Sequence, residues 1–288
     1  MGCIKAIHIL LLVLCFAVVS IPQIGVVEAQ DAICIRSDGK VTGTDKIQRD
    51  ESCFGYYYFT GDIEIKSAGY GIRVEKGNIV IDGLGHTLTG NEHCVGFNLN
   101  EKGNVTIKNL VFKNWDCGIA NFGDHCTIEG NQITGGHHGI NLEVADGCTI
   151  IGNELVDNFI DLRLIDSYDN NITGNSIGRL FWNMWMDLSP GDNYFSGNYW
   201  ETYEGVDENG DGFGDTPHVA YWLTDDEDEG CYDNNPLMKP IVIPEFPSWA
   251  ILPLVITATL MVVICKKRLL KTQNQQLIHI RSLIADDC

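Results

Sequence analysis

The chain has 288 residues, with 19 lysines and arginines against 39 aspartates and glutamates, and a formal net charge of −20. Residues 31–240 hold 13 of the basic and 35 of the acidic residues, so this body alone carries a charge of −22. Such a surface repels nucleic acid and anionic lipid, because phosphate contacts require cationic side chains. It is compatible with neutral glycans and with divalent cations.

The N-terminus has the pattern of a secretory signal. A short apolar run from Ile7 to Val19 follows Lys5, and Val27 and Ala29 stand where small residues precede a cleavage site. We therefore expect residues 1–29 to be a signal peptide. The mature chain would then lie outside the cytosol, where disulfides are permitted.

Residues 31–75 form an irregular segment ahead of a repeat, and we expect them to be an N-terminal cap. Residues 55–60 and 71–74 have the composition of short strands that lead into the first repeat. Cys34 and Cys53 both lie in this segment, and we predict a disulfide between them. The body contains seven cysteines, so at least one thiol stays unpaired within the chain.

Residues 76–200 contain a degenerate repeat of about 22 residues. Residues two apart lie on one face of a strand, so the first and third positions of each segment should share a face. Six segments begin at Ile79, Val105, Cys126, Cys148, Asn170 and Asn193, and their third positions are Ile81, Ile107, Ile128, Ile150, Ile172 and Phe195. The third position is apolar in every segment, which predicts an inward-facing column.

Each segment ends in a turn. Its fifth position is glycine or asparagine, which favours a backbone with positive φ, and asparagine follows at 131, 153, 175 and 198. We expect these asparagines to stack in a hydrogen-bonded ladder that holds the register. The fifth positions are Gly83, Asn109, Gly130, Gly152, Gly174 and Gly197, and a second apolar column follows at Phe112, Ile133, Leu155, Ile177 and Trp200.

Short strands at a nearly constant period predict an all-β fold, a right-handed parallel β-helix of five to six clear coils with a cap at each end. A helical solenoid is excluded because apolar residues do not recur at helical spacing over three turns. A β-sandwich would not repeat its turn at constant spacing.

Residues 201–240 are expected to form an acidic C-terminal cap that contains a calcium loop. The spacing follows the EF-hand pattern, with a backbone carbonyl at position 7 and glycine at position 6, but position 12 is His218 rather than glutamate. The predicted ligands are Asp207, Asn209, Asp211, Phe213 and Asp215. The alternative is an acidic turn that binds no ion.

The C-terminal part is predicted to anchor the protein in the cell membrane. Residues 241–248 are a Pro-rich linker, and residues 249–265 are an uncharged stretch that we expect to be the membrane span. Together with residues 241–243 and the Pro-rich hinge, this stretch is long enough to span a bilayer. The basic cluster at 266–268 places the tail, residues 266–288, in the cytoplasm and the body outside, in a single-pass arrangement. The alternative is a buried core helix.

Both ends of the body resemble a known family. Residues 59–63 (Phe-Thr-Gly-Asp-Ile) and 79–88 resemble the opening of NosD-like β-helices of the CASH type, which are carbohydrate-binding and sugar-hydrolysis domains. Residues 197–217 and 233–238 resemble the ending of the same family. The resemblance covers roughly residues 55–240. It implies a parallel β-helix, and it implies copper handling because NosD-like proteins are associated with copper maturation of a reductase.

The C-terminal segment resembles the PEF-type anchor of archaeal surface proteins. Residues 244–248 read Pro-Glu-Phe-Pro-Ser and precede the apolar stretch and the basic cluster. The same pattern is similar to a sorting signal for archaeosortase-type transpeptidases. Twenty residues follow Arg268, whereas such signals stop soon after the basic cluster. This departure favours a retained anchor.

The copper ligands suggested by the resemblance would be His137, His138, Met184 and Met186, because imidazole and thioether bind copper. Adjacent histidines on a strand point to opposite faces, which argues against chelation of one ion. Met184 and Met186 alternate with Trp185 and fit a core pattern equally well. We therefore expect calcium rather than copper as the cofactor.

Catalytic candidates are Asp161, Arg163 and Asp187, with Glu143 nearby. Lyases and hydrolases with a β-helix fold use such residues on an outer face, and glycoside cleavage needs two carboxylates at a set separation. Asp161 and Arg163 share one strand face, and the role that we predict for them first is a surface ion pair.

Further modifications are also predicted. Cys126 and Cys148 occupy one column on consecutive coils at a spacing that permits a disulfide. Asn104-Val-Thr and Asn171-Ile-Thr are glycosylation sequons.

The function that these patterns favour is a membrane-anchored extracytoplasmic β-helix that presents a surface for a glycan or a cell-surface protein. Aromatic rings stack on sugars through their apolar faces, and the candidates are Trp115, Phe122, Trp182 and Trp185. The alternatives are a polysaccharide lyase or glycoside hydrolase, a copper-handling accessory protein and a structural surface-layer component.

Overall fold

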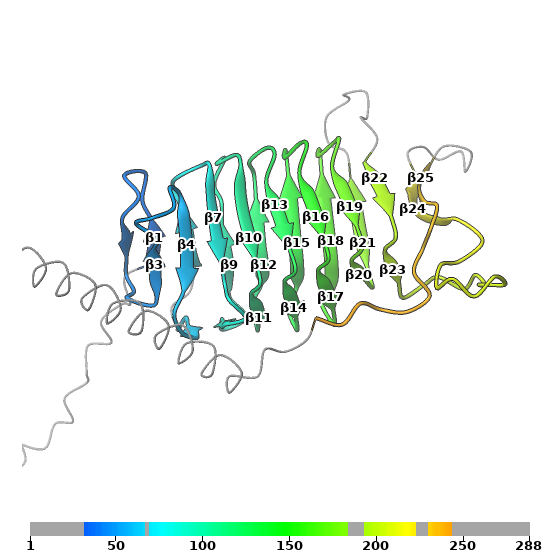
Figure 1. Cartoon of the computed structure of the whole chain (residues 1–288), viewed down its shortest axis with the longest axis horizontal. Coiled ribbons are helices and arrows are strands. Elements are labelled where there is room, and N and C mark those ends of the chain that lie inside the picture. The colour runs from blue at the N-terminus through cyan, green and yellow to red at the C-terminus, as the bar shows by residue number, and fades with distance from the viewer. Residues whose placement is uncertain (1–31, 67–68, 184–192, 223–229, 244–288) are drawn as a thin grey trace, which may run out of the picture.

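The computed structural model of the protein describes residues 32–66, 69–183, 193–222 and 230–243. Within these residues the regular elements are β-strands, and three sheets wind into a parallel β-solenoid of about six turns (Figure 1). No helix in this part of the chain is long and apolar enough to cross a membrane. The predicted signal peptide (1–29), membrane span (249–265) and tail (266–288) lie outside the described residues.

Most coils contribute one strand to each sheet. The eight-stranded sheet consists, in spatial order, of β2 (Val41–Thr42), β1 (Ile33–Ile35), β6 (Gly69–Val74), β9 (Cys94–Asn98), β12 (Cys117–Asn121), β15 (His138–Glu143), β18 (Ile160–Ile165) and β21 (Leu180–Asn183). The seven-stranded sheet consists of β23 (Tyr199–Trp200), β20 (Ser176–Ile177), β17 (Glu154–Val156), β14 (Gln132–Thr134), β11 (Val111–Lys113), β8 (Thr87–Thr89) and β5 (Ile63–Glu64).

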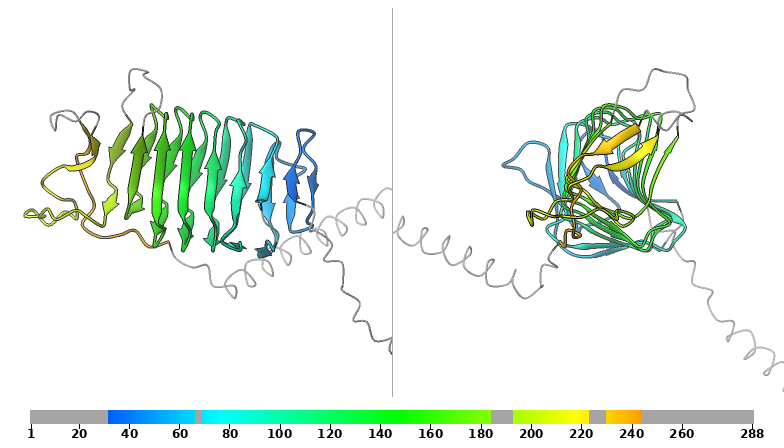
Figure 2. Two further views of the ribbon diagram at one scale, coloured as in Figure 1. Left: turned by 180° about the vertical axis from the view of Figure 1, so that it is seen from behind. Right: turned by 90° about the vertical axis from the view of Figure 1, so that its right-hand side faces the viewer.

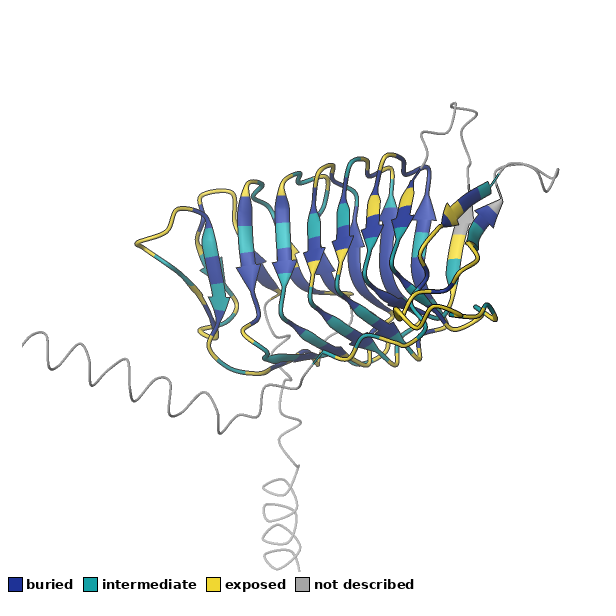
Figure 3. Ribbon diagram, turned by 45° about the vertical axis from the view of Figure 1, so that its right-hand side comes forward, coloured by how far each residue is buried: buried dark blue, intermediate teal, exposed yellow. Residues whose placement is uncertain are grey.

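The ten-stranded sheet forms the third side. It consists of β24 (His218–Trp222), β25 (Gly230–Asp233), β22 (Tyr194–Ser196), β19 (Asn171–Thr173), β16 (Thr149–Ile151), β13 (Thr127–Glu129), β10 (Val105–Lys108), β7 (Ile79–Asp82), β4 (Tyr56–Phe59) and β3 (Ile47–Arg49). Buried positions lie along the strands, whereas exposed positions gather mainly in the turns between them (Figure 3).

Both predicted apolar columns are confirmed. In the ten-stranded sheet Ile107 pairs with Ile81 and with Ile128, and the column continues in register to Phe195. In the seven-stranded sheet Phe112 pairs with Ile133, and that column continues to Trp200. All members are at most 2% exposed, so the repeat supplies a continuous core.

The predicted asparagine ladder is also confirmed. Asn131, Asn153, Asn175 and Asn198 are fully buried, and the side-chain oxygen of each later member accepts hydrogen bonds from the backbone and side-chain amides of the one before. Positive φ precedes each asparagine at its glycine. The first turn differs, because positive φ falls on Leu84 and Gly85 rather than on Gly83.

The strand of each coil in the eight-stranded sheet was only partly anticipated. Glycines stack in this sheet at positions 71, 96, 118 and 139, which interrupts the alternating pattern. A Cβ on Gly118 would lie 2.7 Å from the carbonyl oxygen of Gly139, so a side chain does not fit between the coils there. The glycines are required by close backbone approach, and they also hide the strand from a hydrophobicity pattern.

The N-terminal cap is smaller than the predicted 31–75 segment. β4, β5 and β6 already pair in parallel with β7, β8 and β9, so a complete coil begins at Tyr56. The cap proper consists of antiparallel pairings of β1 with β2 and of β3 with β4. At the other end β24 and β25 form an antiparallel hairpin across the last coil (Figure 2). Tyr221 of β24 packs edge-on against Phe195 at 5.8 Å, which closes the core.

Candidate functional site

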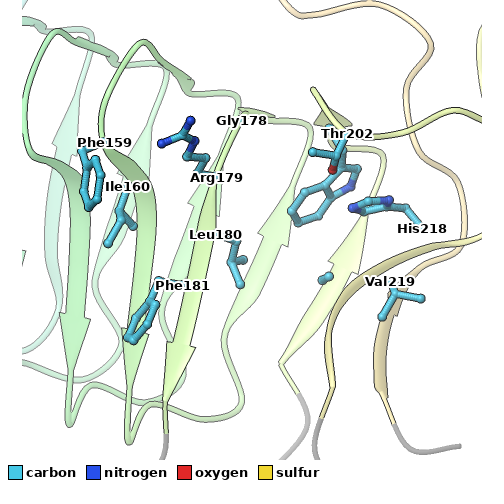
Figure 4. A pocket seen from close by; sticks show the side chains of 11 residues that line it. Phe159, Ile160, Gly178, Arg179, Leu180, Phe181, Thr202, His218 and Val219 are labelled. Carbon is cyan, nitrogen blue, oxygen red and sulfur yellow. The ribbon is translucent and has the colours of Figure 1, made fainter. Parts of the chain in front are cut away.

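A hollow of about 600 Å³ opens between β21, the last strand of the eight-stranded sheet, and β24 of the C-terminal hairpin (Figure 4). Its floor is apolar, with Leu180 and Trp200 facing it. Its rim carries the polar groups of Arg179, Thr202 and His218. Strands that are distant in the chain thus build one concave surface, which is the usual form of a ligand site.

Two phenylalanines are exposed at this hollow. Phe159 is 58% exposed and Phe181 is 40% exposed, although large apolar side chains are usually covered. We name the surface formed by Phe159, Arg179, Phe181, Thr202 and His218 the aromatic groove. Its exposed rings and few polar groups are suited to a ligand with both apolar and hydroxylated faces.

Phe159 is the centre of a column that crosses three coils. Its ring stacks on His137 with centroids 4.9 Å apart and an interplanar angle of 8°. The guanidinium carbon of Arg179, from the following coil, lies 6.0 Å from the Phe159 ring centroid. Arg179 forms no ion pair with the residues that the structure describes.

A second hollow, of about 410 Å³, adjoins Phe159 on the side of the preceding coils. It is lined by Glu92, Trp115, Asp116, His137 and two glycines. Because Phe159 borders both hollows, it separates an acidic depression from the aromatic groove.

The two histidines lie closer together than predicted. His137 precedes β15, which begins at His138, so strand alternation does not separate them. Their Nδ1 atoms are 3.2 Å apart. Burial lowers the pKa of His138, and the neighbouring His137 lowers it further. The prediction that the two rings point to opposite faces was wrong, although no cluster of three or more His, Cys, Asp or Glu suited to a metal occurs among the described residues.

Asp161 lies in the interior rather than on the surface, which corrects the predicted ion pair. It is 2% exposed, and its carboxylate accepts bonds from the amides of Gly178 at 2.8 Å and Arg179 at 2.9 Å. The Asn158 side chain donates to the other oxygen at 2.8 Å. Burial raises the pKa of Asp161, and these donors oppose that rise. The carboxylate thus joins consecutive turns, while Arg163 instead reaches Glu143 at 3.7 Å and Asn141 at 3.0 Å.

Glu201 is a carboxylate that the sequence did not single out. A Cβ on Gly178 would lie 2.7 Å from Asp161 Oδ2 and 2.9 Å from Glu201 Oε2, so both carboxylates border this glycine. The oxygens of Asp161 are occupied by amide donors, which leaves Glu201 as the accessible carboxylate of the pair. Asp187, the third catalytic candidate, lies outside the described residues, as do Met184 and Met186.

The predicted calcium ligands lie on one exposed loop. Asp207 accepts bonds from the amides of Gly210, Asp211 and Gly212, and φ is positive at Gly210 and Gly212. Asn209 and Asp211 cap the amides two residues later, and Asp215 accepts from the amide of Glu208 and the side chain of Asn209. The loop is held by its own side-chain oxygens, with Phe213 at position 7.

The described cysteines are free thiols. Cys34 is buried in β1 whereas Cys53 is exposed in a turn, and the predicted disulfide between them is not formed in the structure. Cys126 and Cys148 are each 1% exposed and stack on consecutive coils. A hydrogen bond with Cys148 lowers the pKa of Cys126, whereas the pKa of Cys148 is raised by the same contact and by burial.

Among the predicted aromatic platforms, Trp115 and Phe122 do not line the groove. Trp115 is 2% exposed and donates from Nε1 to the Leu88 carbonyl oxygen at 3.0 Å, so it is a core residue. The side chains of Trp182 and Trp185 lie outside the described part. The sequon residues Asn104 and Asn171 are both exposed, as attachment of a glycan requires.

Residues 37–205, more than half of the chain, match the family described as periplasmic copper-binding protein (NosD). The chain belongs to the NosD family. No curated protein and no solved structure matches it. The family description is consistent with an extracytoplasmic body for this NosD-like β-helix.

The copper named in the family description has no matching ligand set in the described part of the chain. His137 and His138 form a pair and Asp116 lies close enough to interact with His138, but among the described residues these groups do not form a cluster suited to a metal. His137 also uses its ring face against Phe159. The described residues therefore do not fit a copper centre.

Proposed function

We propose that this NosD-like protein is a membrane-anchored, extracytoplasmic β-helix that binds an extended glycan in the aromatic groove. The observation that supports the proposal most directly is the exposure of Phe159 and Phe181, at 58% and 40%, beside a hollow of about 600 Å³. Stacking of sugar C–H groups on these rings would remove apolar surface from water. Arg179, Thr202 and His218 would supply hydrogen bonds to hydroxyl groups.

The membrane anchoring rests on the sequence of the C-terminal segment. An uncharged stretch at 249–265 is followed by a basic cluster, which is the pattern of a single span with a cytoplasmic tail. The family description agrees with a body on the outer side of that membrane. Anchoring would hold the groove near the cell surface, where glycans are abundant.

The glycan proposal is tested by binding of the full-length protein to a panel of immobilised polysaccharides. Phe159→Ala and Phe181→Ala should each weaken binding about tenfold, which corresponds to about 1.4 kcal/mol. Phe54→Ala is the matched control, because Phe54 is 83% exposed but lies in the N-terminal cap. Equal loss in the control, or no binding by any variant, would contradict the proposal.

The same incubation distinguishes binding from cleavage. A binding protein leaves the polysaccharide at its original length. New reducing ends or unsaturated products that disappear in Glu201→Gln would identify a hydrolase or lyase instead, because Glu201 is the accessible carboxylate beside the groove.

Calcium is proposed as a ligand of the cap loop between Asp207 and Asp215. The loop has oxygen-bearing side chains at positions 1, 3, 5 and 9 and glycine at position 6. Bound calcium would neutralise part of the acidic cap and stiffen the segment that precedes β24. The C-terminal side of the aromatic groove would then depend on the ion, since His218 belongs to that strand.

A further inference from the structure

A segment that leaves the C-terminal hairpin runs back along the seven-stranded sheet (Figure 1). We name residues 234–243 the strap. Its Leu237 donates from the backbone amide to the carbonyl oxygen of Asn198 at 2.8 Å and forms a β-bridge with Tyr199 of β23. The strap is therefore attached first to the last coil of the solenoid.

The strap continues over two further coils. The amide of Ile241 donates to Ser176 Oγ of β20 at 2.8 Å, and that hydroxyl lies 3.3 Å from the carbonyl oxygen of Ile241. The amide of Ile243 reaches Glu154 Oε2 of β17 at 3.4 Å. Successive contacts at β23, β20 and β17 show that the strap travels along the solenoid axis. Its last described contact, which we name the exit point, is at β17, the third strand from the C-terminal end of this sheet.

The exit point restricts how the body can sit on a membrane. Only residues 244–248 separate Ile243 from the predicted span at 249–265, and five extended residues reach at most about 18 Å. Four strands, β14, β11, β8 and β5, lie beyond β17 toward the N-terminus, and they cover about 19 Å at 4.8 Å per strand. On the other side lie β20, β23 and the acidic cap. An upright solenoid would require the linker to pass one of these ends.

The outer face of the seven-stranded sheet is mostly uncharged, and its charged groups are of both signs. The outward side chains of its central strands are mostly threonine, valine and glutamine, as at Thr89, Val111 and Gln132, with an exposed lysine at Lys113 and a half-buried glutamate at Glu154. Glu64 is paired with Lys66 at 3.6 Å, and Glu154 accepts from Gln132 at 3.1 Å.

The opposite edge, where the eight-stranded sheet turns into the ten-stranded sheet, is acidic. Four consecutive turns expose Glu101, Asp124, Asp146 and Asp169, with one half-buried lysine, Lys102, among them. A membrane surface with anionic headgroups would repel this edge and tolerate the seven-stranded face.

We propose that the seven-stranded sheet is the membrane-facing surface of the anchored protein. This inference rests on the membrane anchoring proposed above. The solenoid axis lies along the bilayer, the strap lies between the body and the headgroups, and the acidic edge points away from the cell. The aromatic groove, which opens beside the eight-stranded sheet, stays on the flank of the body and is accessible from outside.

Energy transfer from the body to labelled lipid tests the orientation in full-length protein in nanodiscs. A donor dye is placed at Lys113→Cys on β11, or at Asp124→Cys on the acidic edge, with Cys53, Cys265 and Cys288 replaced by serine. We expect at least threefold more transfer to headgroup acceptors from Lys113→Cys. Equal transfer, or more from Asp124→Cys, would overturn the proposal.

The strap contact is tested with Ser176→Ala in the same labelled proteins. Loss of the Ser176 hydroxyl removes both contacts to Ile241, so the difference between the two dye positions should shrink. Ser196→Ala is the matched control, because Ser196 lies on β22 away from the strap. An undiminished difference in Ser176→Ala would contradict the role of the strap.

A measurement without added cysteines uses the native lysines. The side chains of Lys66 and Lys40 are 75% and 79% exposed, but Lys66 follows β5 of the seven-stranded sheet whereas Lys40 lies in the N-terminal hairpin. In nanodiscs a water-soluble amine reagent should modify Lys66 several-fold more slowly than Lys40. Equal rates would contradict the orientation.

Flotation with vesicles after alkaline extraction tests the anchoring separately. If the protein floats but the reagent modifies Lys66 and Lys40 at equal rates, only the proposed orientation is contradicted. If the protein does not float, the proposed anchoring is contradicted, and the orientation that rests on it is contradicted as well.

Discussion

Asp233 accepts a hydrogen bond from the side-chain amide of Asn198 at 3.0 Å and from its backbone amide at 2.8 Å. The asparagine ladder that begins at Asn131 therefore ends on a carboxylate. The same carboxylate receives the indole Nε1 of Trp200 at 3.0 Å and the amide of Gly197 at 3.0 Å. Asp233, a residue of the C-terminal hairpin, thus terminates the ladder and fixes the Trp200 ring that covers the end of the core.

Asp233→Ala should destabilise the protein by about 3 kcal/mol, because several buried donors lose their acceptor at once. The measurement is chemical unfolding followed by circular dichroism. Glu129→Ala removes an exposed carboxylate on β13 and serves as the control, with an expected effect within about 0.5 kcal/mol. Similar loss in both variants would show that the ladder does not depend on its terminal acceptor.

Ionisation of Asp82 should make the free energy of unfolding depend on pH in the acidic range. Burial would raise its pKa, but hydrogen bonds from Tyr56 and Asn109, together with Lys108 at 3.5 Å, hold the pKa of Asp82 below its ordinary value. A carboxyl with a depressed folded-state pKa contributes stability above its unfolded pKa of about 3.9, and that stability is lost as the pH falls through the lower folded value. Unfolding from pH 6 to about pH 2 should therefore show a loss below about pH 4 that is smaller in Asp82→Asn.

Calcium should raise the melting temperature of the full-length protein relative to a sample in chelator, because a ligand that binds only the folded state stabilises it. Asp207→Ala should abolish the difference, since Asp207 holds position 1 and caps three amides of the loop. Asp146→Ala, on the opposite side of the fold, should retain it. A melting temperature that is the same with calcium and chelator would eliminate the site.

Among the seven body cysteines, Cys53 should be the one that reacts with a maleimide in the native protein, because the other six are buried. Peptide mapping by mass spectrometry locates the label, and denaturation should expose the remaining thiols. A Cys53 that becomes reactive only after reduction, together with Cys34, would establish the disulfide predicted from the sequence.

The periodic part of the fold was predictable from the residues. Each coil repeats the same local pattern, in which an apolar pair is followed by a tight turn. Ile107 therefore predicts the inward column, Gly130 the positive φ and Asn131 the asparagine ladder, without knowledge of distant contacts. The eight-stranded sheet was harder to see, because Gly96, Gly118 and Gly139 serve close backbone approach and carry no hydrophobic signal.

The individual site residues were predicted less well. Asp161 and Arg163 stand two apart on β18, which suggested a surface pair, but the turn at Gly178 supplies amide donors that draw the Asp161 carboxylate inward. Trp115 is an aromatic residue of the kind that stacks on sugars, yet its ring is buried in the core. The missing side chains of Gly71 and Gly90 leave the space that the ring fills. The exposure of a side chain depends on which part of it the neighbouring coil covers, and a pattern of adjacent residues does not predict that.

The amino-acid sequence by itself determined the coiled shape of the body, because repeat period and turn residues act over a few neighbouring positions. It also predicts export and membrane anchoring from the apolar runs near its two ends. Only the tertiary structure decided which surfaces are available. Phe159, Phe181 and His218 line one hollow because coils stack and the C-terminal hairpin folds across the last one. The strap reaches Ser176 and Glu154 because the chain reverses along the solenoid after Asp233. Contacts over such separations in the chain depend on how coils and caps pack in space.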